Sequence, residues 1–93
     1  EAGARPELCD HLGQKKIAML GSDNWAIEAF PPVKEGHTVY CHMNLLVRRG
    51  ISLFENLDLD QLSEDQAYEF LFTWAPLKLV GATGSPGNPL AAY

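Results

Sequence analysis

The sequence has no surplus of basic residues, and this narrows the partners that it can have. Its 93 residues include 7 lysines and arginines against 12 aspartates and glutamates, so the formal net charge is −5. Nucleic acids and anionic membrane surfaces both select proteins with a basic face. The charge balance therefore predicts that neither nucleic acid nor membrane is the main partner.

Long apolar runs are also missing. No stretch approaches the ~20 apolar residues that a membrane span needs, and no signal peptide is visible. The hydrophobic content of 46% and charged content of 20% are typical of a globular protein. The length predicts a single domain, residues 1–93, with a thin core. The chain begins at Glu1 rather than at a methionine, as expected of a processed or truncated piece of a longer protein.

Cysteine is scarce. The two cysteines, Cys9 and Cys41, are too few and too far apart in the sequence for a disulfide framework. We expect both to be reduced and buried, which is typical of a cytoplasmic protein.

Several motifs of enzyme active sites are absent as well. The sequence contains no HExxH and no CxxC, and the glycine-rich residues 81–85 lack the lysine and the spacing of a phosphate-binding loop. Cys41 stands beside His42, but adjacent residues of a helix point about 100° apart, which disfavours a thiol nucleophile with its base. No complete catalytic constellation is therefore present.

In the first half of the chain the pattern alternates between helix and strand. Pro6 fits the first turn of a helix that Gly13 is expected to end. Residues 17–20 form a short apolar run, which predicts a buried strand. Residues 39–47 predict a second helix, ended by Gly50 in a left-handed conformation, and residues 51–54 predict a strand.

The second half contains mainly strand signals. Ser63 with Gln66 resembles a capping box for a one-turn helix. Residues 70–74 and 77–80 predict two further strands, and the glycine- and proline-rich tail from residue 81 should be irregular. This order of elements favours the α+β class, with a mixed sheet and two main helices, over a regular α/β sheet.

Three aromatic residues, Trp25, Phe30 and Trp74, are expected mainly to pack in the core. The alternative for Trp25 is a place in a ligand pocket, because it follows a turn of the kind that often borders a site.

Two residues are candidate metal ligands, His42 and Glu55. Considered alone, each is more often a solvated or structural side chain, and a mononuclear catalytic centre needs about three protein ligands. A helix that starts at His42 and a strand that ends at Glu55 would run back along each other through the turn at Gly50. We therefore expect the two side chains to lie close enough to share an ion.

Three blocks of the sequence, GSDNWAIEAFP, HMNLLVRRGISLFENLDLDQL and YEFLFTWAPLKLVGATGSPGNPLA, occur in an order that resembles a known family. The family is that of the putative cyclase, or kynurenine-formamidase-like, metal-dependent hydrolases, and the resemblance extends from about Leu8 to Ala91. Its typical features are H-x-x-L-L, a Gly-Ile turn, E-N-L-D-L, and a closing A-P-L followed by G-x-x-x-S-P.

The resemblance implies a fold, a site and a chemistry. The fold would be part of a swivelling β/β/α architecture. His42 and Glu55 would contribute to a metal centre, in which Zn²⁺ or Mn²⁺ suits imidazole and carboxylate ligands. Such a metal generates hydroxide for the hydrolysis of a small cyclic or acyclic amide.

The family's N-terminal motif, H-x-G-T-H-x-D-x-P, does not occur in this chain. The chain therefore resembles only the C-terminal third or so of such an enzyme and is not expected to be catalytically competent alone. Three alternatives remain open: a fragment of a longer enzyme, a subunit of a split enzyme, or a stand-alone, non-catalytic binding or assembly protein. A homo-oligomer or a missing N-terminal half is the expected partner, because unpaired strand edges invite pairing with another chain.

Overall fold

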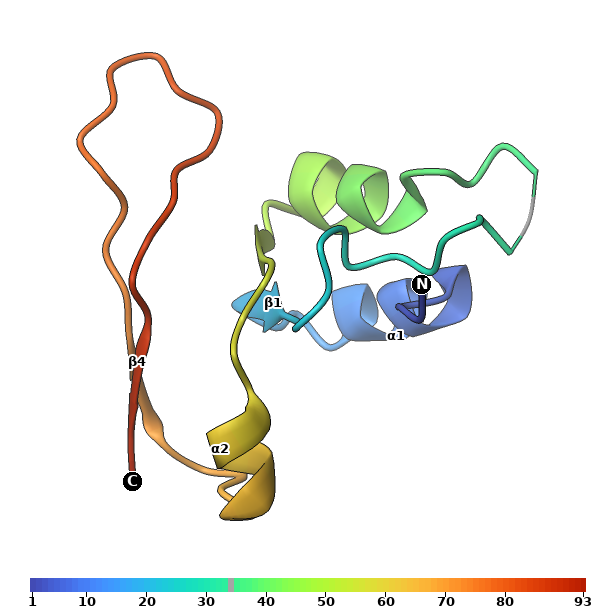
Figure 1. Ribbon diagram of the computed structural model, residues 1–93. Coiled ribbons are helices and arrows are strands. Elements are labelled where there is room, and N and C mark those ends of the chain that lie inside the picture. The colour runs from blue at the N-terminus through green and yellow to red at the C-terminus, as the bar shows by residue number, and fades with distance from the viewer. Residues whose placement is uncertain (34) are drawn as a thin grey trace. The chain divides into compact units, whose positions relative to one another are not determined.

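The computed structural model describes residues 1–33 and 35–93, and in them the chain divides into two compact units, Glu1–Leu59 and Asp60–Tyr93. The described residues form three helices and two small sheets (Figure 1). The predicted α+β class is therefore confirmed. The expected mixed sheet is wrong, because the strands form two separate pairs, one parallel and one antiparallel. The single domain expected from the chain length stays a prediction.

The first helix of unit 1, α1, spans Pro6–Gln14 and begins as predicted with proline in its first turn. Its predicted end was wrong: Gly13 lies inside the helix, and Lys16 adopts the left-handed conformation, with φ of 54°. Gly13 instead makes room for a neighbour, since a Cβ there would lie 2.6 Å from Arg49 Nε. The glycine allows the helix to approach that arginine closely.

A parallel strand pair and a second helix complete unit 1. Strand β1 (Met19–Gly21) pairs with β2 (Ser52–Phe54), and between them in sequence lies the π-helix η1 (His42–Val47). Gly50 ends this helical segment with φ of 68°, while the N–H groups of Gly50 and Ile51 donate to the carbonyls of Leu46 and Leu45. The bond from the Gly50 N–H to the Leu46 carbonyl is that of the αL motif, so the predicted left-handed cap is confirmed.

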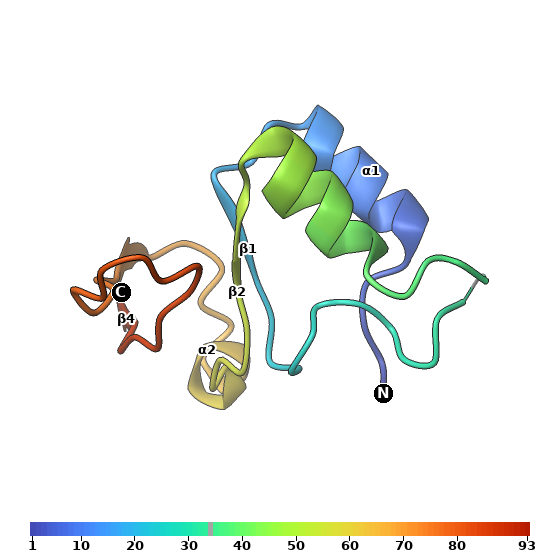
Figure 2. The same cartoon turned by 90° about the horizontal axis from the view of Figure 1, so that it is seen from above.

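The core of unit 1 lies between its helices and strands. Figure 2 shows α1 and η1 side by side, with β1 and β2 next to them. The buried apolar residues are Cys9, Ile27, Cys41, Leu45 and Ile51.

Cys9 and Cys41 form a disulfide in this core, with their Cα atoms 5.5 Å apart. Both residues are buried, as expected, but the expectation that they are reduced was wrong. Separation along the chain says little about separation in space. Contact between α1 and η1 brings the two Cα atoms into the 4.4–6.8 Å range that a disulfide requires.

Unit 2 consists of the short helix α2 (Asp60–Glu64) and an antiparallel pair, β3 (Leu71–Thr73) with β4 (Leu90–Ala92). The capping box was a wrong prediction, because Ser63 lies inside α2 rather than before it.

Two further predictions for unit 2 were wrong. Residues 77–80 form no strand: the Leu79 N–H bonds back to the Leu77 carbonyl, and the Leu77 N–H donates to Ser85 Oγ, 2.8 Å away. The tail is not wholly irregular, because β4 pairs with β3. No residue of unit 2 is buried, so its apolar side chains have no core of their own.

In the described part of the chain, no helix has both the length and the apolar character needed to cross a membrane.

Candidate metal centre

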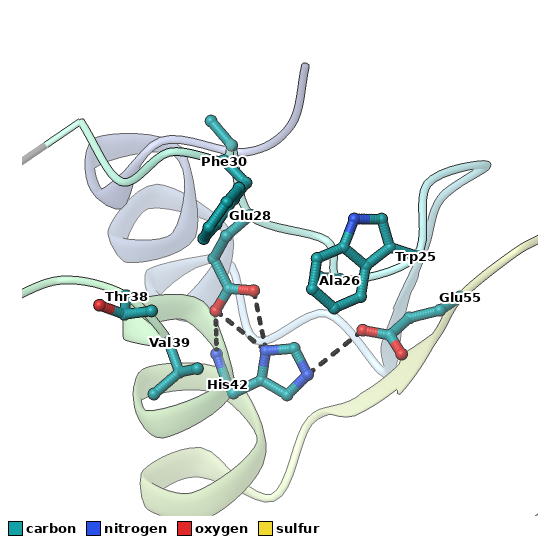
Figure 3. A pocket seen from close by; sticks show the side chains of 9 residues that line it. Trp25, Ala26, Glu28, Phe30, Thr38, Val39, His42 and Glu55 are labelled. Atoms are coloured by element: carbon teal, nitrogen blue, oxygen red, sulfur yellow. Dashed lines mark hydrogen bonds and ion pairs between the residues drawn. The ribbon is translucent and has the colours of Figure 1, made fainter. Parts of the chain in front are cut away.

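The imidazole of His42 lies between two carboxylates (Figure 3). On one side, Nδ1 is 2.9 Å and 2.8 Å from the two carboxylate oxygens of Glu28. On the other side, Nε2 is 3.2 Å from Glu55 Oε1. The proximity of His42 and Glu55 that the sequence predicted is therefore confirmed, while the sharing of a metal ion stays a prediction.

Local geometry explains how these two residues meet. His42 begins η1, and the chain reverses at Gly50 before β2 runs back and ends just ahead of Glu55. The next residue, Asn56, has φ of 55°, and its N–H donates to the Asn24 carbonyl 2.9 Å away. This bond ties the segment after β2 to the loop that follows β1.

Glu28 is the site residue that the sequence analysis missed. It is only 6% exposed, and its Oε1 also accepts a hydrogen bond of 2.8 Å from the backbone N–H of His42. A signal existed: Glu28 is the one acid within the otherwise apolar residues 25–30. An acid in an apolar run is either exposed at a break in the pattern or buried with a partner, because an unpaired buried carboxylate is costly.

A neutral His42 ring has one N–H proton, but a carboxylate lies at each of its two nitrogens. A neutral imidazole donates from one nitrogen and accepts at the other, so it can donate to only one of the two carboxylates. Glu55 Oε1 lies within ion-pair distance of Nε2, yet it is buried and has no hydrogen-bond partner. The two observations are compatible, because a short distance alone does not make a hydrogen bond and the angle must also be favourable. If Nδ1 carries the only ring proton, Nε2 and the Glu55 carboxylate face each other as two acceptors, and either a proton or a metal cation between them would relieve their repulsion.

A divalent cation fits this pair of atoms. Zinc bonds to nitrogen and oxygen are each about 2.0–2.1 Å, so two ligand atoms of a tetrahedral ion lie about 3.3 Å apart. The observed separation of 3.2 Å between His42 Nε2 and Glu55 Oε1 agrees with this value. Glu28 lies at the opposite nitrogen and cannot join the same ion. In residues 1–33 and 35–93 no group of three His, Cys, Asp or Glu side chains could hold a metal.

A cavity of about 380 Å³ opens beside the two carboxylates and the imidazole. Its walls are mainly apolar and aromatic, formed by Trp25, Ala26, Ala29, Phe30 and Val39, with Thr38 as a further polar residue. The volume is within the range of sites for small organic molecules.

Two aromatic side chains of this cavity are not in the core. Trp25 and Phe30 are 57% and 50% exposed and meet edge to face, with their ring centres 6.3 Å apart. The expectation of core packing was therefore wrong for both residues. The alternative for Trp25, a place in a pocket wall, agrees with its position (Figure 3).

The other histidines lie outside this centre. His11 is exposed on α1, and His37 stacks on Tyr40 with ring centres 4.7 Å apart. Tyr40 donates a hydrogen bond of 2.8 Å to Asp10, and this bond raises the pKa of Tyr40 above its ordinary value. Asn44 donates to the same Asp10 oxygen, so this network ties α1 to η1.

Two features of the sequence, Cys41 beside His42 and the glycine-rich residues 81–85, have structural roles in this fold. Cys41 is bonded to Cys9, which removes the thiol that a nucleophile beside His42 would need. In the glycine-rich segment, Ser85 Oγ accepts a hydrogen bond from Leu77 N–H and donates one to the Pro86 carbonyl, so it stabilises a turn.

No family model, curated protein or solved structure matches this chain. The resemblance to the cyclase-like hydrolases rests on the quoted sequence blocks alone and stays a prediction.

Proposed function

We propose that this chain is the C-terminal portion, or one subunit, of a metal-dependent amide hydrolase, and that His42 and Glu55 are its share of the metal ligands. The observation that carries the proposal is the buried Oε1 of Glu55, which has no hydrogen-bond partner and lies 3.2 Å from His42 Nε2. The two atoms have the spacing of neighbouring ligands on one Zn²⁺ or Mn²⁺ ion. Such an ion, when bound, supplies hydroxide by lowering the pKa of a bound water.

The chain's own residues would perform the remaining tasks. His42 and Glu55 bind the ion, and the aromatic side chains of Trp25 and Phe30 give the cavity an apolar wall that takes up the substrate and excludes water. A small cyclic or acyclic amide is the substrate class that follows from the resemblance. The swivelling β/β/α architecture belongs to the same proposal.

Two ligands do not make a competent centre, because catalytic zinc sites have about three protein ligands. The missing ligand or ligands must come from another polypeptide segment, either an N-terminal half or a second subunit. Unit 2 supports the need for a partner. Tyr68, Leu71 and Val80 are 83%, 67% and 106% exposed, and a unit without buried residues gains stability when another surface covers it.

The disulfide bears on where such a protein works. The cytoplasmic location was expected because the cysteines were expected to be reduced, and the disulfide removes that argument. Disulfides persist mainly in oxidising compartments, so Cys9–Cys41 favours such a compartment over the cytoplasm.

The experiment is a calorimetric titration of the purified chain with Zn²⁺ and with Mn²⁺. We expect one ion per chain, bound weakly, with binding lost in both His42→Ala and Glu55→Gln. His11→Ala is the matched control, because it removes an exposed imidazole from α1 and should leave the affinity unchanged. Equal affinities in the wild type and in both site variants would overturn the metal centre.

An activity assay tests the second part of the proposal. N-formylkynurenine and related amides should not be hydrolysed by the chain alone with either metal. Metal-dependent turnover that His42→Ala abolishes would show that the chain is competent without a partner.

A second candidate is a stand-alone, non-catalytic protein that binds or assembles through unit 2. The observation that favours it is the exposed apolar surface of that unit. The two functions differ in one measurable respect, because assembly through unit 2 does not depend on His42 or Glu55.

A further inference from the structure

Glu28 has a task that the proposed metal centre does not account for. It is nearly fully buried and directs both carboxylate oxygens at Nδ1 of His42, at 2.9 Å and 2.8 Å, while Glu55 faces Nε2. A buried carboxylate needs hydrogen-bond donors, and two of those that Glu28 finds belong to His42: the ring Nδ1 and the backbone N–H.

The backbone that presents Glu28 is strained. Ile27, a β-branched residue, has φ of 60°, which such residues rarely adopt. The Glu28 N–H bonds back to the Ala26 carbonyl, so residues 26–28 make a tight three-residue turn with Ile27 at its centre. This turn directs the Glu28 side chain at η1.

Asn24 holds that turn in place. Its Oδ1 accepts from the Ile27 N–H at 2.9 Å, and its Nδ2 donates to the Ile27 carbonyl at 3.2 Å and to the Ala2 carbonyl at 2.9 Å. Asn24 is itself buried. Both backbone groups of the strained residue are therefore bonded to one side chain.

The N-terminal segment supports the turn from its other side. The Ala4 N–H donates to the Ile27 carbonyl, and the Ala4 carbonyl accepts from the Ala29 N–H. A Cβ on Gly3 would lie 2.6 Å from the backbone nitrogen of Ala29. Only glycine permits this approach. A strained backbone conformation that the surrounding structure holds from two sides is more typical of a functional site than of an ordinary connecting loop.

We infer that Glu28 is a positioning residue that fixes His42 in the tautomer protonated on Nδ1. The Nδ1–H donates to Glu28, and the lone pair of Nε2 then points at Glu55, where it would be free to bind a cation shared with that carboxylate. For the cation the inference rests on the proposed function, whereas the tautomer is a property of the metal-free chain. Carboxylates that accept from the outer nitrogen of a metal-binding histidine act in this way in metal sites generally.

The first measurement is the tautomer itself, in the metal-free protein. Nitrogen-15 labelling of histidine, with two-bond nitrogen–proton correlation spectra, identifies which ring nitrogen of His42 carries the proton. The spectra are recorded at a pH where the ring nitrogen signals show a single ring proton. We expect Nδ1–H alone in the wild type and a mixture of tautomers in Glu28→Gln, which keeps the shape of the side chain but removes its charge.

The second measurement is zinc affinity in the same variants. Glu28→Gln should weaken binding by about 10- to 100-fold, as losses of such outer partners typically do. Glu7→Gln is the matched control, because it makes the same charge change at an exposed position on α1 and should alter neither readout. Gly3→Ala is the indirect variant: it leaves Glu28 in the sequence but displaces its backbone, and should weaken binding in the same direction.

The outcomes separate the two proposals. A wild-type ring protonated on Nε2, or a Glu28→Gln ring that keeps Nδ1–H alone, would overturn the role of Glu28 whatever the metal does. A wild type that shows Nδ1–H, loses it in Glu28→Gln and yet binds no zinc would leave the positioning role standing and would refute the metal centre.

Discussion

The disulfide between Cys9 and Cys41 should provide a large part of the stability of unit 1. It closes a separation of 32 residues, for which the chain-entropy relation gives about 12 cal/mol/K, or about 3.7 kcal/mol at 25 °C. A chain of this length has a free energy of unfolding of about 5–14 kcal/mol. Loss of the bond should therefore remove a quarter or more of the total.

Urea unfolding measures this loss, with the fluorescence of Trp25 as the probe. The experiment uses a Trp74→Phe background, so that the signal comes from unit 1 alone. With a denaturant slope of about 1–3 kcal/mol per molar urea, reduction should lower the midpoint by about 1–4 M. The urea midpoint of the double variant Cys9→Ala/Cys41→Ala should fall at least as far, because this variant also lacks two buried sulfur atoms.

A comparison of three proteins separates the causes. The oxidised and reduced wild types differ only in the bond, whereas the reduced wild type and the double alanine variant differ only in the packing of the sulfurs. Two free thiols in the unreduced, denatured protein, or identical midpoints for its oxidised and reduced forms, would refute the reasoning.

Three further predictions concern other parts of the chain. Asn24→Ala should destabilise unit 1 by about 1–3 kcal/mol, because it leaves the buried N–H of Ile27 without its acceptor, while Asn88→Ala at an exposed position should cost almost nothing in the same urea titration. Ultraviolet absorbance against pH should show Tyr40 and Tyr93 ionising above 10.0, since their hydrogen bonds to Asp10 and Asp65 raise the pKa of each; Asp10→Asn and Asp65→Asn should bring the respective values down. Because the folded pKa is the higher one, each bond's stabilisation is fully present below pH 10.0 and declines as the pH rises through the folded value. Light scattering after size exclusion should give a mass of two or more chains, unchanged in His42→Ala and lowered in Leu71→Asp; a single-chain mass at all concentrations would refute self-association through unit 2.

Local rules predicted the elements whose signals lie within a few residues of one another. Pro6 marks the start of α1, and Gly50 closes η1 in a left-handed conformation, because each residue restricts the backbone at its own position. The same reasoning placed His42 beside Glu55, since a helix, a tight turn and a strand bring their outer ends together.

Contacts between distant segments could not be predicted in this way. The Cys9–Cys41 bond depends on how α1 packs on η1, and no local pattern encodes that packing. Glu28 was missed for a related reason, because its conformation requires a strained Ile27 that only the Asn24 side chain and the N-terminal segment make tolerable.

The errors in unit 2 have a different origin. Short apolar runs suit a strand or a turn equally well, and residues 77–80 form turns stabilised by Ser85. Glycines and prolines around residues 81–89 suggested an irregular tail, yet the three residues of β4 pair with β3 because an antiparallel partner is within reach.

Location of a bound metal by anomalous scattering tests the central claim most directly. Crystals of the chain grown with Zn²⁺ would be measured on both sides of the zinc absorption edge. We expect one anomalous peak within about 2.0–2.2 Å of both His42 Nε2 and Glu55 Oε1, with Glu28 still bonded to Nδ1. A hydrogen bond between Nε2 and Oε1 with no ion between them, or a zinc peak only at His11 or His37, would contradict the shared metal centre.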